Sequence, residues 1–238
     1  MLFRRRSSLT PARSAALAGV LRAPTFELVP LKNALDQAEF LPAGATVSVT
    51  ASPAKGIDAT VALCEQLQVR GFRAIPHLSA RMIRDREHLS ELIAWLEGAG
   101  VDRAFVVGGD AKEPGDYPDG LALLRAMAEI GHPLTEIGIP AYPQGHAFIA
   151  DRPPLEAMRD KATYASYMTT QLCFDPNATA PWLAARRAAG SASPVPLALP
   201  GRQAPPPPPT HPPPTAGRDT TPAPLQTHAG PHPRVPDR

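Results

Sequence analysis

The sequence predicts an α/β protein built as an incomplete (β/α)8 barrel of the TIM type, with six to seven of the eight strands. Between Phe26 and Gly190, short apolar or β-branched runs alternate with stretches of helical spacing, and the runs begin roughly 20 to 30 residues apart. One strand and one helix of that total length return the chain to a parallel neighbour. Six successive runs end in a polar residue, which fits a ring of loops around one pocket better than the single crevice of an open, doubly wound sheet.

Six runs are expected to form the strands. They begin with FELV and TVSVT, and each is bounded by residues typical of turns. The expected ranges are 26–29, 46–50, 74–78, 104–107, 137–142 and 167–174. The segment from Val195 to Gly201 carries prolines and is interpreted as a damaged seventh strand.

The helices between these runs have recognisable start and stop signals. The stretch from Ile57 to Arg70 places its apolar residues on one face and stops before a glycine. Asp85 is expected to cap the next helix, which ends near Gly98 and Gly100. Two further helices are expected at 121–130 and 181–189, each followed by a glycine that can adopt the left-handed conformation.

Composition excludes several classes of function. The 238 residues carry a formal net charge of +2, too small for a protein that mainly binds the nucleic-acid backbone. Cys64 and Cys173 form neither a disulfide framework nor a zinc-binding spacing, and no metal site is predicted. Because no apolar run approaches the ~20 residues needed to span a bilayer, the sequence predicts a soluble protein without a membrane partner. The two cysteines are expected to be core residues in a reducing compartment, and the protein is expected to be cytoplasmic.

The chain is expected to divide into three parts. Residues 1–24 are predicted to be a disordered basic leader, and residues 25–201 the partial barrel. Residues 202–238 are predicted to be a disordered, proline-rich tail, because they have almost no apolar side chains to bury. The abrupt change near Gly201 is explained either by a polyproline linker or ligand, or by a shifted reading frame that truncates the barrel.

The polar residues at the strand ends are the candidates for chemistry. Glu27 lies within an apolar strand, where it either pairs with a buried cation or acts as a general acid with a raised pKa. Each of the others could also simply satisfy backbone groups or cap a loop. Together they supply an acid, an imidazole, a second carboxylate, an amide and a ring for stacking, from Glu27, Thr50, His77, Asp110, Tyr142, His146 and Gln171. Gly108–Gly109–Asp110 lacks the glycine spacing of a dinucleotide-binding turn.

Six of these strand-end stretches resemble, in order, those of the methylenetetrahydrofolate reductase family, flavin-dependent (β/α)8 barrels of one-carbon metabolism. They are FELVP, TVSVTASP, IPHLSAR, AFVVGGD, IPAYPQGH and TTQLCFD, and they span about Phe26 to Pro176. The resemblance implies an oxidoreductase that takes a hydride from NADH or NADPH onto FAD. The flavin then passes the hydride to 5,10-methylenetetrahydrofolate, which gives 5-methyltetrahydrofolate.

The resemblance also implies a role for each matching residue. Glu27 is the expected proton donor, and Asp110 is expected between flavin and pterin as a second catalytic and substrate-binding group. Gln171 is expected to bind the pterin of the folate substrate. The positions matching flavin contacts are Thr50, His77, Gly109, Asp110, Tyr142 and His146.

Two positions depart from the family pattern. Gly108 occupies the place of an arginine that often contacts the cofactor, and a lysine expected before the sixth strand is displaced to Lys161. The alternatives are therefore a non-catalytic barrel fragment that binds folate or a protein partner, and a flavin-independent or reverse-running relative that oxidises methyltetrahydrofolate. The sequence leaves a homo-oligomer open.

Overall fold

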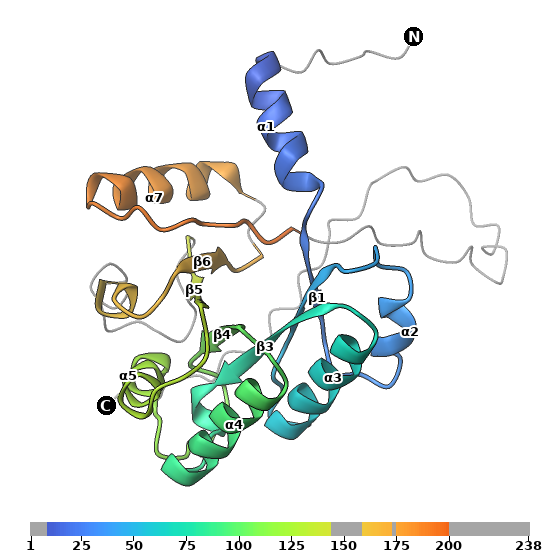
Figure 1. Cartoon of the computed structure of the whole chain (residues 1–238). Helices are drawn as coiled ribbons and strands as arrows, with labels where there is room; N and C mark the ends of the chain where they lie inside the picture. The colour runs from blue at the N-terminus through green and yellow to red at the C-terminus, as the bar shows by residue number, and fades with distance from the viewer. Residues whose placement is uncertain (1–8, 144–158, 173–174, 200–238) are drawn as a thin grey trace, which may run out of the picture. The chain divides into compact units, whose positions relative to one another are not determined.

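The computed structural model describes residues 9–143, 159–172 and 175–199, and its strands form one curled, all-parallel sheet (Figure 1). The strands are β1 (Thr25–Leu28), β2 (Thr46–Val49), β3 (Arg73–Ser79), β4 (Arg103–Val107), β5 (Glu136–Ala141) and β6 (Tyr167–Thr170). Their order in the sheet is the order in the sequence, with no point of reversal. A consecutive parallel order belongs to a barrel wall and not to a doubly wound sheet. The predicted α/β class and the six expected strands are confirmed.

Side chains alternate between two faces along every strand. The register aligns Val47 with Ala74 and Ala104 with Ile137, and these residues are buried. They belong to two apolar clusters that also contain helix residues such as Leu67 and Leu92. The other face of the strands carries polar and aromatic side chains: Glu27, Ser48, Arg73, His77, Phe105, Glu136 and Tyr167.

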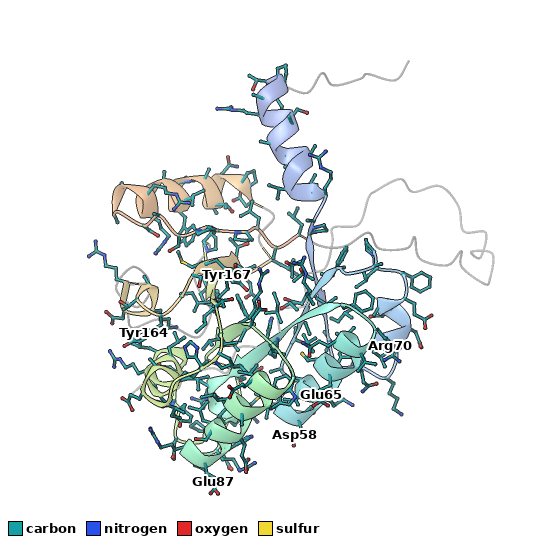
Figure 2. The ribbon with its side chains drawn as sticks, viewed as in Figure 1. Asp58, Glu65, Arg70, Glu87, Tyr164 and Tyr167 are labelled. Carbon is teal, nitrogen blue, oxygen red and sulfur yellow. The ribbon has the colours of Figure 1, made fainter. Side chains whose placement is uncertain are left out.

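The helices follow one another around the outer side of the curled sheet (Figure 1). They are α2 (Ala34–Ala38), α3 (Ile57–Val69), α4 (Arg86–Gly98), α5 (Gly120–Ile130) and α7 (Pro176–Ala188), with a 3-10 turn, η1 (Ala80–Met82). Asp85 caps α4 by accepting a hydrogen bond from the His88 N–H at 2.8 Å, as predicted. Asp58 and Glu87 point away from the sheet (Figure 2), so these helices bury one face and expose the other. None of the helices in the described part of the chain has the length and apolar character needed to cross a bilayer.

Two helices differ from the sequence prediction. Pro11–Leu21 forms α1 within the segment expected to be a disordered leader. Thr10 caps it, proline is favourable at its first position, and the interior is rich in helix-forming Ala and Leu. None of its residues is buried, which is why no apolar stripe revealed it. Helix α7 begins at Pro176 instead of residue 181 because Asp175 caps it, and Pro181 lies inside the helix.

The damaged seventh strand lies beside β6 and forms half of a parallel ladder. The Met168 N–H donates to the Pro194 carbonyl at 3.0 Å, and the Thr170 N–H donates to the Pro196 carbonyl at 3.1 Å. A complete ladder needs an N–H from residue 196, which proline lacks. The Ala198 N–H donates to Thr170 Oγ1 at 3.0 Å instead of to a backbone carbonyl. The predicted tail at 202–238 lies outside the described residues and stays a prediction.

An aromatic row crosses the inner face of the sheet. The rings of His77 and Phe105 have centroids 4.8 Å apart, and those of Phe105 and Tyr167 are 6.3 Å apart. Gly138 lies between Phe105 and Tyr167 in the register. A Cβ atom at Gly138 would approach Tyr167 Cζ to 2.4 Å and Phe105 Cδ2 to 2.5 Å. The row can therefore close only over a residue without a side chain.

Replacing Gly138 by alanine is expected to destabilise the fold by about 1–3 kcal/mol, because both rings must move in a packed interior. The measurement is urea unfolding followed by far-UV circular dichroism. Gly98→Ala is the matched control, since nothing lies within 4 Å of its Cβ position and alanine favours a helix. Equal stability of G138A and the wild type would show that the two rings are not held against this glycine.

Candidate functional site

The predicted site residues lie at the carboxyl ends of consecutive parallel strands. Glu27 is the next-to-last residue of β1 and His77 is near the end of β3, whereas the others follow their strands directly or within a short turn. Parallel strands place all these ends at one edge of the sheet. Those others are Thr50 after β2, Gly109 and Asp110 after β4, Tyr142 after β5 and Gln171 after β6. His146 lies outside the described residues.

Glu27, His77 and Ser48 form one group on the inner face. Ser48 Oγ and His77 Nε2 are 2.7 Å apart and joined by a hydrogen bond. Glu27 Oε2 lies 3.9 Å from the same ring nitrogen. Because both neighbours address Nε2, the group is not the relay of a serine hydrolase, which uses the two ring nitrogens separately.

Burial changes the pKa of both titratable groups. Desolvation lowers the pKa of His77 to about 4, so its imidazole is neutral at pH 7. Desolvation also raises the pKa of Glu27, although 64% of its side chain is exposed. No lysine or arginine pairs with Glu27 among the described residues. The buried ion pair considered for Glu27 is thus absent from this part of the chain, and its environment favours the protonated acid.

The aromatic row forms the floor beneath these strand ends. Phe105 is buried and Tyr167 is half-buried. Burial, reinforced by the Glu136 carboxylate and partly offset by Arg103, raises the pKa of the Tyr167 phenol to about 12. Arg103 and Glu136 form an ion pair with Nε to Oε2 at 3.4 Å. The aromatic row itself therefore carries no charge at neutral pH, and the Arg103–Glu136 ion pair lies beside Tyr167.

The glycine pair after β4 allows two strand ends to approach closely. Gly109 has φ of 83°, and a Cβ atom there would lie 2.0 Å from Ser79 Oγ. Ser79 Oγ is buried and has no hydrogen-bond partner in the described part of the chain. The next residue, Asp110, is exposed. Gly109 is thus required by both backbone conformation and space, and the exposed Asp110 follows it directly.

A lysine stands close to the glycine that replaces the expected arginine. The Gly120 Cβ position lies 3.5 Å from the Gly108 nitrogen and 3.7 Å from Lys161 Nζ. Gly108 itself has room, because a Cβ there would meet only the Gly120 nitrogen at 3.9 Å. Gly108 replaces an expected arginine and so removes a positive charge from this place. The ammonium group of Lys161 supplies a positive charge close by.

The remaining predicted residues share the edge without joining the Glu27 group. Burial raises the pKa of the Tyr142 phenol. The Gln171 N–H donates to the Ala141 carbonyl at 2.9 Å, which fixes the β6 end beside β5 while its side chain stays exposed. The side chains of Asp110 and Gln171 have no hydrogen bond or ion pair in the described part of the chain. They are available to a ligand.

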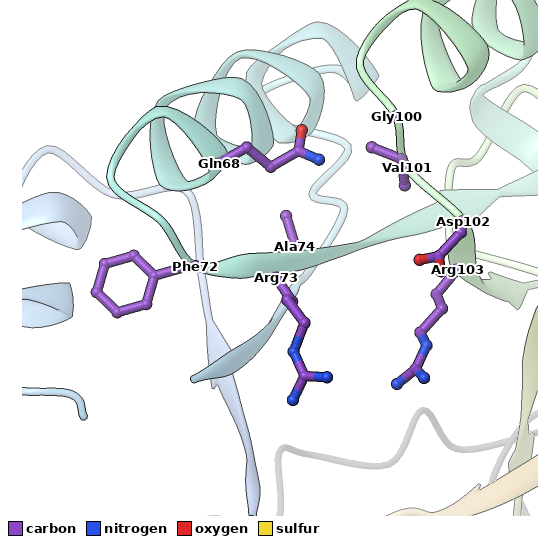
Figure 3. A pocket seen from close by; sticks show the side chains of 8 residues that line it. All are labelled: Gln68, Phe72, Arg73, Ala74, Gly100, Val101, Asp102 and Arg103. Carbon is purple, nitrogen blue, oxygen red and sulfur yellow. The ribbon is translucent and has the colours of Figure 1, made fainter. Parts of the chain in front are cut away.

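A hollow of about 130 Å³ lies at the opposite end of the sheet (Figure 3). Its lining includes Gln68 and Phe72, together with Arg73 and Arg103 at the start of β3 and β4. The predicted residues lie at the other strand ends, so this hollow is separate from them. The described residues contain no group of three His, Cys, Asp or Glu side chains placed to hold a metal ion.

The prediction from sequence missed the inner layer below the strand ends. Ser48, Ser79, Phe105, Gly138 and Tyr167 were not identified as parts of the site. The signal that could have found them is the strand pleat, because residues two positions before a strand-end group face the same side. Ser48 lies two positions before Thr50, and Phe105 and Gly138 lie four positions before Gly109 and Tyr142, an even spacing that keeps the same side.

No protein-family model matches the chain. A solved structure described as a xylose isomerase domain protein from Planctomyces limnophilus is similar at 12% sequence identity with a TM-score of 0.38. That similarity covers 74% of this chain and 90% of the other.

The lowered pKa of His77 predicts a specific dependence of stability on pH. The unfolded chain binds a proton near pH 6.5, whereas folded His77 binds it only near pH 4. The contribution of neutral His77 to the free energy of unfolding is thus fully present above pH 6.5. It falls by up to about 3 kcal/mol as the pH is lowered toward 4. Urea unfolding of the wild type and His77→Gln at several pH values measures it: the difference between them should shrink as the pH falls. Parallel pH profiles would contradict a buried, neutral His77.

Proposed function

We propose that this chain is a methylenetetrahydrofolate reductase-like oxidoreductase whose half-barrel derives from a (β/α)8 barrel. The observation that carries the proposal is the Glu27 group. A carboxyl group with a raised pKa stands at the end of the first strand, beside a neutral imidazole and without a cationic partner in the described part of the chain. A carboxyl group with a raised pKa keeps its proton to higher pH than an ordinary glutamate, and protonation of a substrate ring nitrogen requires such a donor.

The residues at the strand ends fit a flavin. The Gly108–Gly109 backbone carries no side chain that would hinder a flat ring, and Thr50, His77 and Tyr142 offer polar atoms around it. Lys161 is near enough to place a positive charge beside an anionic part of the cofactor. FAD bound here supplies hydride transfer from NADH or NADPH.

The remaining residues provide orientation for a folate. Asp110 and Gln171 are exposed at the same edge as Glu27. The Asp110 carboxylate has two acceptor oxygens, and the Gln171 amide has a donor and an acceptor. These groups match the donor and acceptor edge of a pterin ring. In this proposal, Glu27 donates its proton to the folate ring nitrogen as the methylene bridge opens, and Asp110 and Gln171 hold the pterin.

Changing Glu27 to glutamine separates the two half-reactions. The amide keeps the shape of the side chain but cannot donate an acidic proton, so reduction of the folate substrate should fall by at least about 100-fold. Reduction of bound flavin by NAD(P)H should change less than about threefold, because hydride transfer to the flavin needs no proton from Glu27. Stopped-flow absorbance of the flavin measures both steps.

Glu87→Gln is the matched control for this variant. Glu87 is an exposed carboxylate in the first turn of α4, and it points away from the sheet (Figure 2). It should leave both half-reactions unchanged. Equal losses of both steps in E27Q would contradict a role for Glu27 as the substrate acid, and a purified wild type without flavin-dependent folate turnover would overturn the proposed activity.

A further inference from the structure

We infer that Ser48 is a positioning residue that keeps the His77 proton on Nδ1, so that His77 donates a hydrogen bond to an acceptor atom of the group bound at the strand ends. The identity of the bound group rests on the proposed function. The tautomer of His77 rests on the structure alone.

The first step is the hydrogen bond between Ser48 and His77. Ser48 Oγ lies 2.7 Å from His77 Nε2, and both side chains are buried. A serine hydroxyl always carries one proton to donate, and a neutral imidazole has one N–H and one acceptor nitrogen. The Ser48 hydroxyl has no other acceptor among the described residues. If Nε2 carried the proton, the buried hydroxyl proton would have no acceptor, which folded proteins avoid.

The second step is the state of the other ring nitrogen. His77 Nδ1 has no hydrogen-bond partner in the described part of the chain, but it is not among the polar atoms sealed from solvent. An N–H at this position can bond to water or to a ligand, whereas the Ser48 hydroxyl, on a residue only 8% exposed, has His77 Nε2 as its one acceptor among the described residues. The Nδ1–H tautomer therefore satisfies both side chains, and the Nε2–H tautomer satisfies only the ring.

The third step is the surroundings of the ring. The groups that face it are Ser48 from β2, Glu27 from β1 and Phe105 from β4. Phe105 packs at 4.8 Å between centroids, which restricts the ring plane. With the proton on Nδ1, the single lone pair of Nε2 accepts from Ser48, and the ring offers no N–H to Glu27 Oε2 at 3.9 Å. The carboxylate therefore gains no hydrogen bond from His77, and this tautomer agrees with Glu27 as a proton donor.

The ligand contacted by Nδ1–H must have an acceptor at the edge of the group it presents to His77. A ring carbonyl oxygen or an unprotonated ring nitrogen meets this requirement, and an amino group does not. His77 would thus select the orientation of a flat heterocycle by the acceptor that it presents. The other polar residues at the strand ends do not by themselves determine this orientation.

The tautomer is tested by two-bond nitrogen–proton NMR of the full chain labelled with 15N-histidine at pH 7, with the His77 signals identified as those missing from His77→Asn. The wild type is expected to show Nδ1 protonated and Nε2 unprotonated. Ser48→Ala should shift His77 toward the Nε2–H form. Ser79→Ala is the matched control: it removes another buried hydroxyl, on the strand next to that of Ser48, that has no hydrogen bond in the described part of the chain. An Nε2–H wild type, or an unchanged pattern in S48A, would overturn the inference.

The donor role is tested by titration with FAD, followed by its fluorescence, in two variants of His77. The asparagine amide nitrogen occupies roughly the place of Nδ1, and the glutamine amide nitrogen roughly that of Nε2. His77→Asn is expected to keep the affinity within about threefold, and His77→Gln to lose about tenfold, the value of one hydrogen bond. Equal losses would overturn the donor role. A wild type that binds no FAD would overturn the flavin in the proposed function, while the NMR result still decides the tautomer.

Discussion

The alternation of side chains along parallel strands is the constraint on which the rest of the structure depends. Residues at odd and even positions of a strand face opposite sides. The positions of Val47, Leu78 and Val106 are committed to the apolar layer beneath the helices. Their immediate neighbours must face inward, whatever they are. Ser48, Phe105 and His77 therefore share the inner face because the helix-facing residues are apolar, and the site is a consequence of how the outer layer packs.

The inner face then determines the protonation states at the strand ends. The aromatic row excludes water from His77 and keeps it neutral, so Glu27 has no positive neighbour to stabilise its carboxylate. The row closes because Gly138 leaves room for the rings on either side. A glycine in β5 thus affects an acid in β1 through the packed rings of Phe105 and His77. The pKa of Glu27 therefore depends on how the rings of the inner face pack.

The sequence was sufficient for the strands and most helices because each has a local signal. Apolar runs predicted all six strands, Asp85 predicted where α4 begins, and the glycines after the helices predicted where α4 and α5 end. Helix α1 was missed because it buries no face and has no apolar stripe. The edge carrying the candidate residues was also predictable, because parallel strands bring their ends together. The inner layer was not: Ser48 reaches His77 across 29 residues, and the pairing depends on a register that no local pattern encodes.

The exposure of Glu27 has a chemical consequence for any ligand at this edge. β1 lies at the edge of the described sheet, and its carboxylate is still largely in contact with water. A flat ring placed above the aromatic row would displace part of that water. Because desolvation penalises the charged form of a carboxyl group, the bound ring would raise the pKa of Glu27 further. Glu27 would then be most fully protonated when a substrate able to accept that proton is bound. The ligand itself would exclude the water that an open half-barrel leaves around the carboxyl group.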